Sequence, residues 1–158
     1  MKKEPKKKLT DAYVKPHNKK ARKVLVKDLQ DVKEDSIILY MLCNTKHGLY
    51  QGGLAVAHPQ IDSKDPLSLF VINTSEIIIN PVMTNHTRHT VDSEEGCLSF
   101  PDKKQIIVQR YNKIQVKYKT ITEDFKLTKV ITEDISGKRA KKFQHEIEHL
   151  DGKFIYKY

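Results

Sequence analysis

Two histidines enclosing two glutamates near the end of the chain form the pattern best suited to chemistry. The stretch reads His145-Glu146-Ile147-Glu148-His149. On a helix, residues four apart share a face, so both imidazoles can reach one metal ion. Glu146 then stands beside the first imidazole, where its carboxylate can exchange protons with a water on that ion. We therefore predict a catalytic metal site here, in preference to two unconnected histidines on a charged helix.

A catalytic metal site also needs a third protein ligand and an open position. Nine residues follow His149, and none of them is His, Cys or Glu. The third ligand is therefore expected from earlier in the chain, where the candidates are Cys43, His47, His58, His86, His89 and Cys97. Cys97 stands out because Gly96 permits a close backbone approach and a thiolate binds iron or zinc well. Cys43 falls in an apolar stretch and is expected to be a small buried hydrophobe.

The composition is that of one globular domain. The chain has 158 residues, of which 38% are apolar, and this suffices for a core. No apolar run approaches the roughly 18 residues that cross a bilayer, and the N-terminus lacks the apolar stretch of a secretory signal. Two cysteines are too few for a disulfide scaffold, so we expect a reducing, cytoplasmic setting without membrane contact.

The net charge of +9 is concentrated at the start of the chain, because residues 1–23 hold ten Lys or Arg and two acids. We predict that residues 1–23 form a basic, flexible tail and that residues 24–158 form the catalytic domain. Tails of this kind are usually solvated. The alternative is a weak contact with a polyanion such as RNA, driven by the release of counterions.

The side chains of the predicted site must be positioned by a mixed set of elements. A helix is expected over residues 28–43, and a second one from Ser136-Gly137 to about Leu150. Short β-branched or alternating runs predict strands at 68–72, 76–79, 106–108, 114–118 and, more weakly, 125–131, with Asn80-Pro81 ending the second. Strands in a run between two helices indicate an α+β fold, with a mostly antiparallel sheet packed around a metal-binding C-terminal helix.

Three segments together resemble the peptide deformylase family. That family has a Gly-rich motif ending in Gln, then Glu-Gly-Cys-Leu-Ser, then His-Glu-x-x-His. The second and third motifs are intact here at residues 95–99 and 145–149, and the similarity extends over about residues 20–158. The resemblance implies metal-dependent hydrolysis of the N-formyl group from the N-terminal formyl-methionine of nascent polypeptides, with release of formate.

Site roles follow from the resemblance position by position. It makes Cys97, His145 and His149 the metal ligands and Glu146 the general acid and base. It implies one divalent metal ion, Fe(II) in cells, with Zn, Ni or Co able to occupy the same site. The remaining roles are donors to the formyl oxygen at Gln60 and the backbone N–H of Leu98, main-chain contacts to the peptide at Leu54, Ala55 and Gly96, and a pairing of Arg110 with Glu95.

The chain departs from the family pattern at two places. In the first motif Ala55 replaces a glycine and His58 replaces an alanine, and His58 is expected to be a packed or hydrogen-bonded residue behind the site. On the helix before His145, the family has apolar residues around the methionine pocket, whereas this chain has Lys138, Lys141 and Lys142. Either these lysines extend outward over an ordinary pocket, which we favour, or they shape it for something other than a plain methionine.

The resemblance also bears on partners and origin. It implies formylated nascent peptides as substrates and a monomeric enzyme, with the basic tail as a possible weak contact to the ribosome or RNA. The short C-terminus resembles the compact deformylases that bacteriophages encode, so a viral origin stays open. Two alternatives remain: a metallopeptidase or other amide hydrolase on the same site, and a catalytically silent module that binds nascent chains or RNA. An intact Glu146 argues against silence.

Overall fold

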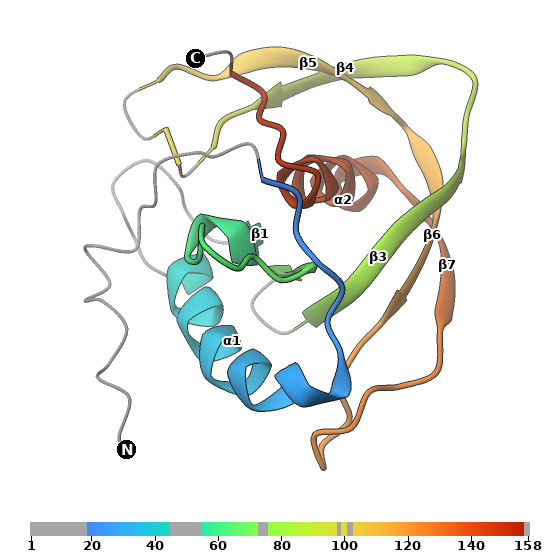
Figure 1. The fold of residues 1–158 in the computed structure, drawn as a ribbon. Helices are drawn as coiled ribbons and strands as arrows, with labels where there is room; N and C mark the ends of the chain where they lie inside the picture. Colours follow the sequence, from blue (N-terminus) through green and yellow to red (C-terminus); the bar gives the residue numbers. More distant parts are fainter. Residues whose placement is uncertain (1–18, 45–54, 73–75, 98, 101–102, 157–158) are drawn as a thin grey trace.

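The computed structural model describes residues 19–44, 55–72, 76–97, 99–100 and 103–156. These residues form an α+β fold, as the sequence predicts (Figure 1). The elements in chain order are η2 (Val26–Asp28), α1 (Leu29–Asn44), β1 (Ala55–Ala57), η3 (His58–Gln60), β2 (Leu69–Ile72), β3 (Glu76–His86), β4 (Thr90–Glu95), β5 (Ile106–Tyr111), β6 (Lys113–Lys119), β7 (Ile131–Ser136) and α2 (Gly137–Leu150). No helix among the described residues is long and apolar enough to cross a membrane.

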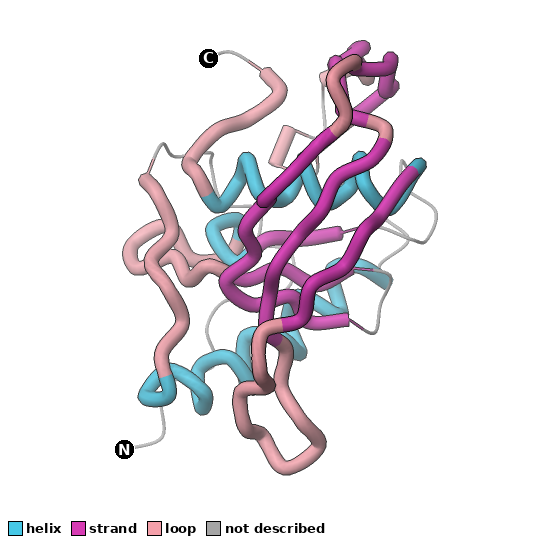
Figure 2. The backbone as a smooth tube through the Cα atoms, turned by 90° about the vertical axis from the view of Figure 1, so that its right-hand side faces the viewer, coloured by secondary structure: helices cyan, strands magenta, loops and turns pink. Residues whose placement is uncertain are grey.

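The strands form two antiparallel sheets. The larger has the order β1-β2-β3-β6-β7, and β4 pairs with β5 in a separate ribbon (Figures 1 and 2). Helix α2 contacts strands of both sheets, whereas α1 contacts β1 and β2. The C-terminal helix is therefore the element on which both sheets converge.

Strand β2 separates two apolar cores because its side chains alternate between its faces. Phe70 and Ile72 join the core that includes Phe143 of α2, and the rings of Phe70 and Phe143 meet edge to face at 5.1 Å. Leu69 and Val71 join the core formed with α1. All four residues of β2 are buried. This part of the sheet thus has α2 on one face and α1 on the other.

Polar contacts fix how α2 is rotated against the sheets. Its first residue, Gly137, has a φ of +62° and donates its N–H to the carbonyl of Asn112 at 3.0 Å. Two turns later the Gln144 amide binds the backbone of Tyr111, accepting its N–H at 2.9 Å and donating to its carbonyl at 2.8 Å. A φ in this range suits glycine, which has no Cβ to clash. These contacts set which face of α2 is turned inward.

The prediction that Asn80-Pro81 ends a strand is wrong. Strand β3 runs on to His86, with an irregularity in its pairing with β6 between Ile79 and Val82. Pro81 cannot donate to a ladder, and such an irregularity is where a strand tolerates it. Asn80 has a φ of +51°, and its side chain bonds both the N–H and the carbonyl of Val24 at 2.8 and 3.1 Å. That contact stabilises the unusual backbone.

Of the other predicted helices and strands, some are confirmed by the structure and one is wrong. The predicted helix at 28–43 corresponds to α1, and the strands at 68–72, 106–108 and 114–118 correspond to β2, β5 and β6. The weak strand at 125–131 is wrong, since the strand in this region is β7, beginning at Ile131. Strands β1 and β4 carry no clear alternation and were not anticipated from sequence. Cys43 lies on α1 and is buried in the core between α1 and the sheet, as expected.

The basic segment at the start of the chain is described only from residue 19 onward. Ala21 is buried and donates its N–H to the carbonyl of Leu150 at 2.8 Å. Arg22 forms ion pairs with Asp28 at 2.9 Å and Asp65 at 2.8 Å. The last residues of the predicted tail therefore contact the domain, and residues 1–18 lie outside the described part.

Candidate metal centre

Cys97, His145 and His149 come together as the sequence predicts. Cys97 follows the end of β4, while the two histidines lie one turn apart on α2. The Cys97 Sγ lies 3.5 Å from His149 Nε2, which lies 3.1 Å from His145 Nε2. The three ligand atoms all lie within 4.8 Å of one another, and no other described group of three His, Cys, Asp or Glu residues could hold a metal ion.

This donor set fits a divalent metal ion. Around a tetrahedral zinc ion with typical Zn–N and Zn–S lengths, neighbouring donors lie about 3.3–3.6 Å apart. The distances between His149 Nε2 and its two partners, 3.5 and 3.1 Å, are close to that spacing. One sulfur and two imidazole nitrogens suit zinc or iron, and three protein ligands leave a coordination position for water or substrate. Cys97 and His149 are both buried.

A partly buried ion-pair network orients the first histidine. His145 Nδ1 lies 2.8 Å from Glu95 Oε1, and Arg110 holds the same carboxylate with two hydrogen bonds of 2.9 and 2.8 Å. Arg110 also reaches Glu148 at 2.6 Å. The predicted pairing of Arg110 with Glu95 is therefore present. A carboxylate on one ring nitrogen directs the other toward a metal, so Glu95 fixes the tautomer that a ligand needs.

Electrostatics keep this network charged. Burial alone would raise the pKa of Glu95, but hydrogen bonds from Arg110 and His145 lower it to about 2. Burial also opposes charge on His145, yet Cys97 and Glu95 raise the pKa of that imidazole to about 10. In the metal-free chain His145 therefore carries a proton that a metal ion has to displace.

Glu146 is the buried acid beside these ligands. It is 3% exposed, and its Oε2 has no hydrogen-bond partner among the described residues. Burial raises the pKa of Glu146 to about 7, while the His145 charge acts in the opposite direction. A carboxyl group with a pKa near neutrality can both take and return a proton at physiological pH. The acid–base role expected of Glu146 stays a prediction, which its burial and raised pKa support.

Gln60 is held in place from both ends of its amide. Its Oε1 accepts the N–H of Ala57 at 2.9 Å, and its Nε2 donates to Ser99 Oγ at 3.1 Å. The first bond closes the short helix η3, and the second ties it to the segment after Cys97. Gln60 is thereby fixed next to the candidate metal ligands.

His58 is a hydrogen-bonded residue away from the ligand group, as expected. Its Nδ1 accepts the N–H of Leu67 at 2.9 Å, which leaves the proton on Nε2. Nε2 lies 2.8 Å from Asp35 Oδ2 on α1. Both side chains are buried, with 1% and 4% of their surface exposed. Both ring nitrogens are thus used within the protein.

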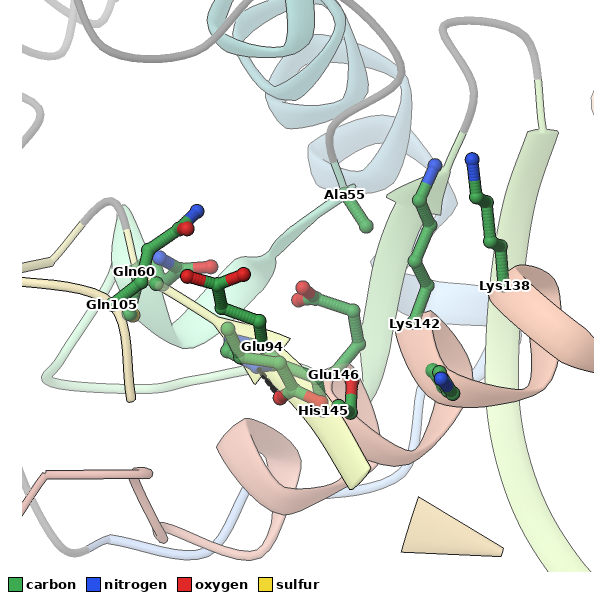
Figure 3. Close-up of a pocket in the computed structure, with 13 residues that line it drawn as sticks. Ala55, Gln60, Glu94, Gln105, Lys138, Lys142, His145 and Glu146 are labelled. Carbon is green, nitrogen blue, oxygen red and sulfur yellow. Dashed lines mark hydrogen bonds and ion pairs between the residues drawn. The ribbon is translucent and has the colours of Figure 1, made fainter. Parts of the chain in front are cut away.

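A cavity of about 390 Å³ opens beside the ligand group (Figure 3). Its lining includes six residues that the sequence analysis assigned to the site: Ala55, Gln60, Gly96, Cys97, His145 and Glu146. Leu54 and Leu98, also assigned to it, lie outside the described residues. Sequence reasoning missed Glu148 as a partner of Arg110, since nothing in the spacing marks it. The three lysines of α2 line the cavity as well.

Comparison with known proteins agrees with this geometry. A sequence model of the family described as polypeptide deformylase matches residues 8–158. The peptide deformylase of Thermotoga neapolitana is 30% identical over 104 residues, which cover 65% of this chain and 60% of that protein. Alignments to the first such curated relatives thus span about 60% of the relatives' length.

Solved structures show the same fold. The crystal structure of peptide deformylase from Thermotoga maritima matches with a TM-score of 0.69 and 27% identity, covering 87% of this chain and 86% of that one. The enzyme from the Vibrio parahaemolyticus bacteriophage VP16T, solved in complex with actinonin, matches with a TM-score of 0.66 and 27% identity, covering 90% and 100%. Phage proteins are therefore among the structural neighbours of this chain.

Proposed function

The chain belongs to the peptide deformylase family, and on that premise we propose that it removes the formyl group from N-terminal formyl-methionine of nascent polypeptides and releases formate. One observation carries the proposal. Cys97, His145 and His149 converge in space, and a buried Glu146 with a raised pKa lines the adjoining cavity. A metal site with an acid–base group at its open side is what hydrolysis of an amide requires.

Cys97, His145 and His149 are the proposed ligands of one divalent ion, with Fe(II) as the native metal and Zn, Ni or Co as substitutes. When bound, such an ion lowers the pKa of a coordinated water toward neutrality and polarises a carbonyl oxygen. Glu146 takes a proton from the attacking water and returns it to the amine of the peptide as the formyl C–N bond breaks. Its pKa of about 7 suits both transfers.

The formyl oxygen needs hydrogen-bond donors as negative charge develops on it. We assign this role to the amide of Gln60 and to the backbone N–H of Leu98. The bonds from Gln60 to Ala57 and Ser99 support its part, because a fixed donor loses no freedom in the transition state. Losing one such donor typically costs about 3 kcal/mol. Leu54, Ala55 and Gly96 are the proposed main-chain contacts to the peptide.

The setting of the enzyme follows from the same proposal. It acts as a monomer in the cytoplasm, where formylated chains emerge from ribosomes. Residues 1–23 are the proposed basic tail of a catalytic domain of residues 24–158, and the end of the tail contacts that domain through Ala21 and Arg22. Their charge supports a weak, salt-sensitive contact with ribosomal RNA.

Formate release from formyl-Met-Ala-Ser by anaerobically purified, metal-analysed protein tests the proposal. The expected result is stoichiometric formate and free amine, with one metal ion per chain. Unformylated Met-Ala-Ser is the control for a metallopeptidase, and it should remain intact. Cleavage of its peptide bonds, or metal-loaded protein that releases no formate, would contradict the proposal.

A further inference from the structure

An aromatic cluster joins the segment after Cys97 to the segment after α2. It consists of Phe100, which follows Cys97, and of Phe154 and Tyr156, which follow α2. The ring of Phe100 lies edge to face with the ring of Phe154 at 5.8 Å and with that of Tyr156 at 5.1 Å. Both centroid distances and both orientations are those that aromatic pairs prefer. The two segments are therefore packed against each other through these three rings.

One ring of the aromatic cluster touches a candidate metal ligand. Phe154 meets the imidazole of His149 edge to face, with 4.8 Å between the ring centroids. The imidazole of His145 also meets that of His149, again at 4.8 Å. Because His149 is buried, its neighbours decide which way its ring can turn. Phe154 thus contributes to the orientation of a side chain that is expected to bind the ion.

The aromatic cluster also leads to the sulfur ligand. Phe100 donates its backbone N–H to the carbonyl of Cys97 at 2.9 Å, which ties the Phe100 ring to the turn that carries the thiol. From Phe100 the contacts continue through Phe154 to His149. Cys97 and His149 are 52 residues apart in the chain, so no local geometry sets the 3.5 Å between Sγ and Nε2. The aromatic contacts connect the two ligands over a short path.

Contacts away from the ligands hold the aromatic cluster in place. The Tyr156 hydroxyl donates to the carbonyl of Lys104 at 2.8 Å, where the chain after α2 meets the segment before β5 (Figure 1). Lys103 Nζ lies 4.9 Å from the ring centroid of Phe100 and 5.1 Å from that of Tyr156. A cation over aromatic faces is attracted by them. Phe154 therefore rests on residues that are fixed by contacts of their own.

The aromatic cluster is separate from the two apolar cores. Neither of the cores formed by the described residues includes Phe100, Phe154 or Tyr156. Those cores hold the sheets against α1 and α2, whereas the aromatic cluster packs beside the metal ligands. A change at Phe154 should therefore affect the ligands more than the packing of the sheets.

We propose that Phe154 is a positioning residue of the metal centre, which keeps the His149 imidazole at the distance from Cys97 that a metal ion requires. Phe154 acts through His149 and is not itself a ligand. Without its ring, the imidazole gains freedom that metal binding must remove, so the ion is held less tightly. Losing an outer partner of a metal ligand typically weakens metal binding by about 10- to 100-fold. For a ring contact we expect the lower end, about tenfold.

Co(II) binding to the purified full-length chain tests the proposal, because the visible spectrum of this ion depends on the geometry of its ligands. Phe154→Ala should raise the Kd for Co(II) by about tenfold and change the spectrum of the bound ion. Phe154→Leu keeps an apolar group against His149 and should recover most of the affinity. Phe125→Ala is the matched control, since Phe125 is an exposed ring in the 120–130 loop, and it should keep the wild-type affinity and spectrum.

Thermal unfolding with and without Zn(II) separates positioning from general packing. A packing role would lower Tm equally in both conditions. A positioning role should also shrink the rise in Tm that Zn(II) produces, because the ion then binds the folded chain less tightly. If Phe154→Ala does not fold, Phe154→Val takes its place with the same expectations.

Wild-type Co(II) affinity and an unchanged spectrum in the folded variant would overturn the proposal. It rests on the assigned metal ligands and not on the reaction. None of these measurements uses formate release, so a chain that binds metal and releases no formate would contradict the proposed function and leave the role of Phe154 standing.

Discussion

One buried and one half-buried histidine of this molecule each pair with a carboxylate, yet only one of the two belongs to the metal centre. His145 lies 2.8 Å from Glu95, and His58 lies 2.8 Å from Asp35. The pairs differ at the second nitrogen of the ring. His58 uses that nitrogen to accept the Leu67 N–H. His145 instead turns it toward His149, within the group of candidate metal ligands. A carboxylate partner therefore does not identify a histidine as a metal ligand. What the second ring nitrogen contacts determines whether the histidine can bind a metal ion.

The two pairs also differ in their surroundings, since one lies inside the protein and the other lies beside a cavity. Asp35 and His58 join α1 to η3 inside the protein, so the contact stabilises packing. Glu95 and His145 join β4 to α2 next to an open cavity, so the contact orients a side chain for chemistry. We call these the closed pair (Asp35 and His58) and the open pair (Glu95 and His145). The comparison predicts that damage to each pair has a different consequence.

The largest expected difference is in metal content. His149→Ala removes a ligand beside the open pair, so bound metal should fall from one ion per chain to none, and turnover with it. His58→Ala should retain one ion per chain. Elemental analysis of both variants after gel filtration measures this. Loss of metal from the His58 variant while it remains folded would break the distinction between the pairs.

The next effect separates catalysis from metal binding, and it concerns Glu146, which follows His145 of the open pair. Glu146→Gln should lower kcat by about 10³-fold, since it removes the proton carrier. Metal content should be unchanged. The variant should also unfold at a higher temperature than the wild type, because a buried carboxylate oxygen without a described partner is replaced by a neutral amide. Kinetics, elemental analysis and thermal unfolding on one preparation check all three, and retained turnover would refute the assigned role.

At the closed pair the expected effect is on stability. His58→Ala removes the contact of the Asp35 carboxylate with Nε2 and the acceptor of the Leu67 N–H, both in the protein interior. The free energy of unfolding should fall by about 3 kcal/mol, measured by urea denaturation. His58→Gln keeps a donor for Asp35 and should recover part of the loss. A variant as stable as the wild type would show that the pair contributes little.

The smallest effect tests the protonation of His58. If Nε2 only donates to Asp35, an amide oxygen can replace the carboxylate. Asp35→Asn should then cost about 1 kcal/mol, clearly less than His58→Ala. Urea denaturation of the two variants side by side makes the comparison. A larger loss in Asp35→Asn than in His58→Ala would mean that the pair depends on a charged imidazole.

Local periodicity made most of the framework predictable. Helix α2 and the intact His-Glu-x-x-His motif were readable because a helix repeats every 3.6 residues and brings His145 and His149 to one face. Cys97 could be chosen because its neighbours match a known motif. Strand β1 has three residues, too few for alternation to show, and β3 passes through Asn80-Pro81 because a distant contact with Val24 stabilises it.

Long-range pairings account for the rest of the site. Asp35 precedes His58 by 23 residues, and Arg110 precedes Glu148 by 38, so no local spacing connects them. The same holds for the cavity, whose lining brings residues of α2 together with Glu94 of β4. The lysines were visible in the sequence, but the favoured expectation was that they extend over an ordinary pocket. In the structure they line the cavity, with Lys138 exposed, and the expectation that they extend outward stays a prediction.

Strand β7 ends at Ser136 and α2 begins at Gly137, with no residue between them. Since β7 is locked to β6, with Ser136 opposite Lys113, the strand sets the starting angle of the helix. One inserted residue at this joint would turn both histidines by about 100° around the helix axis and away from Cys97. Insertions and deletions during evolution should therefore be tolerated in the 120–130 loop and purged at this junction.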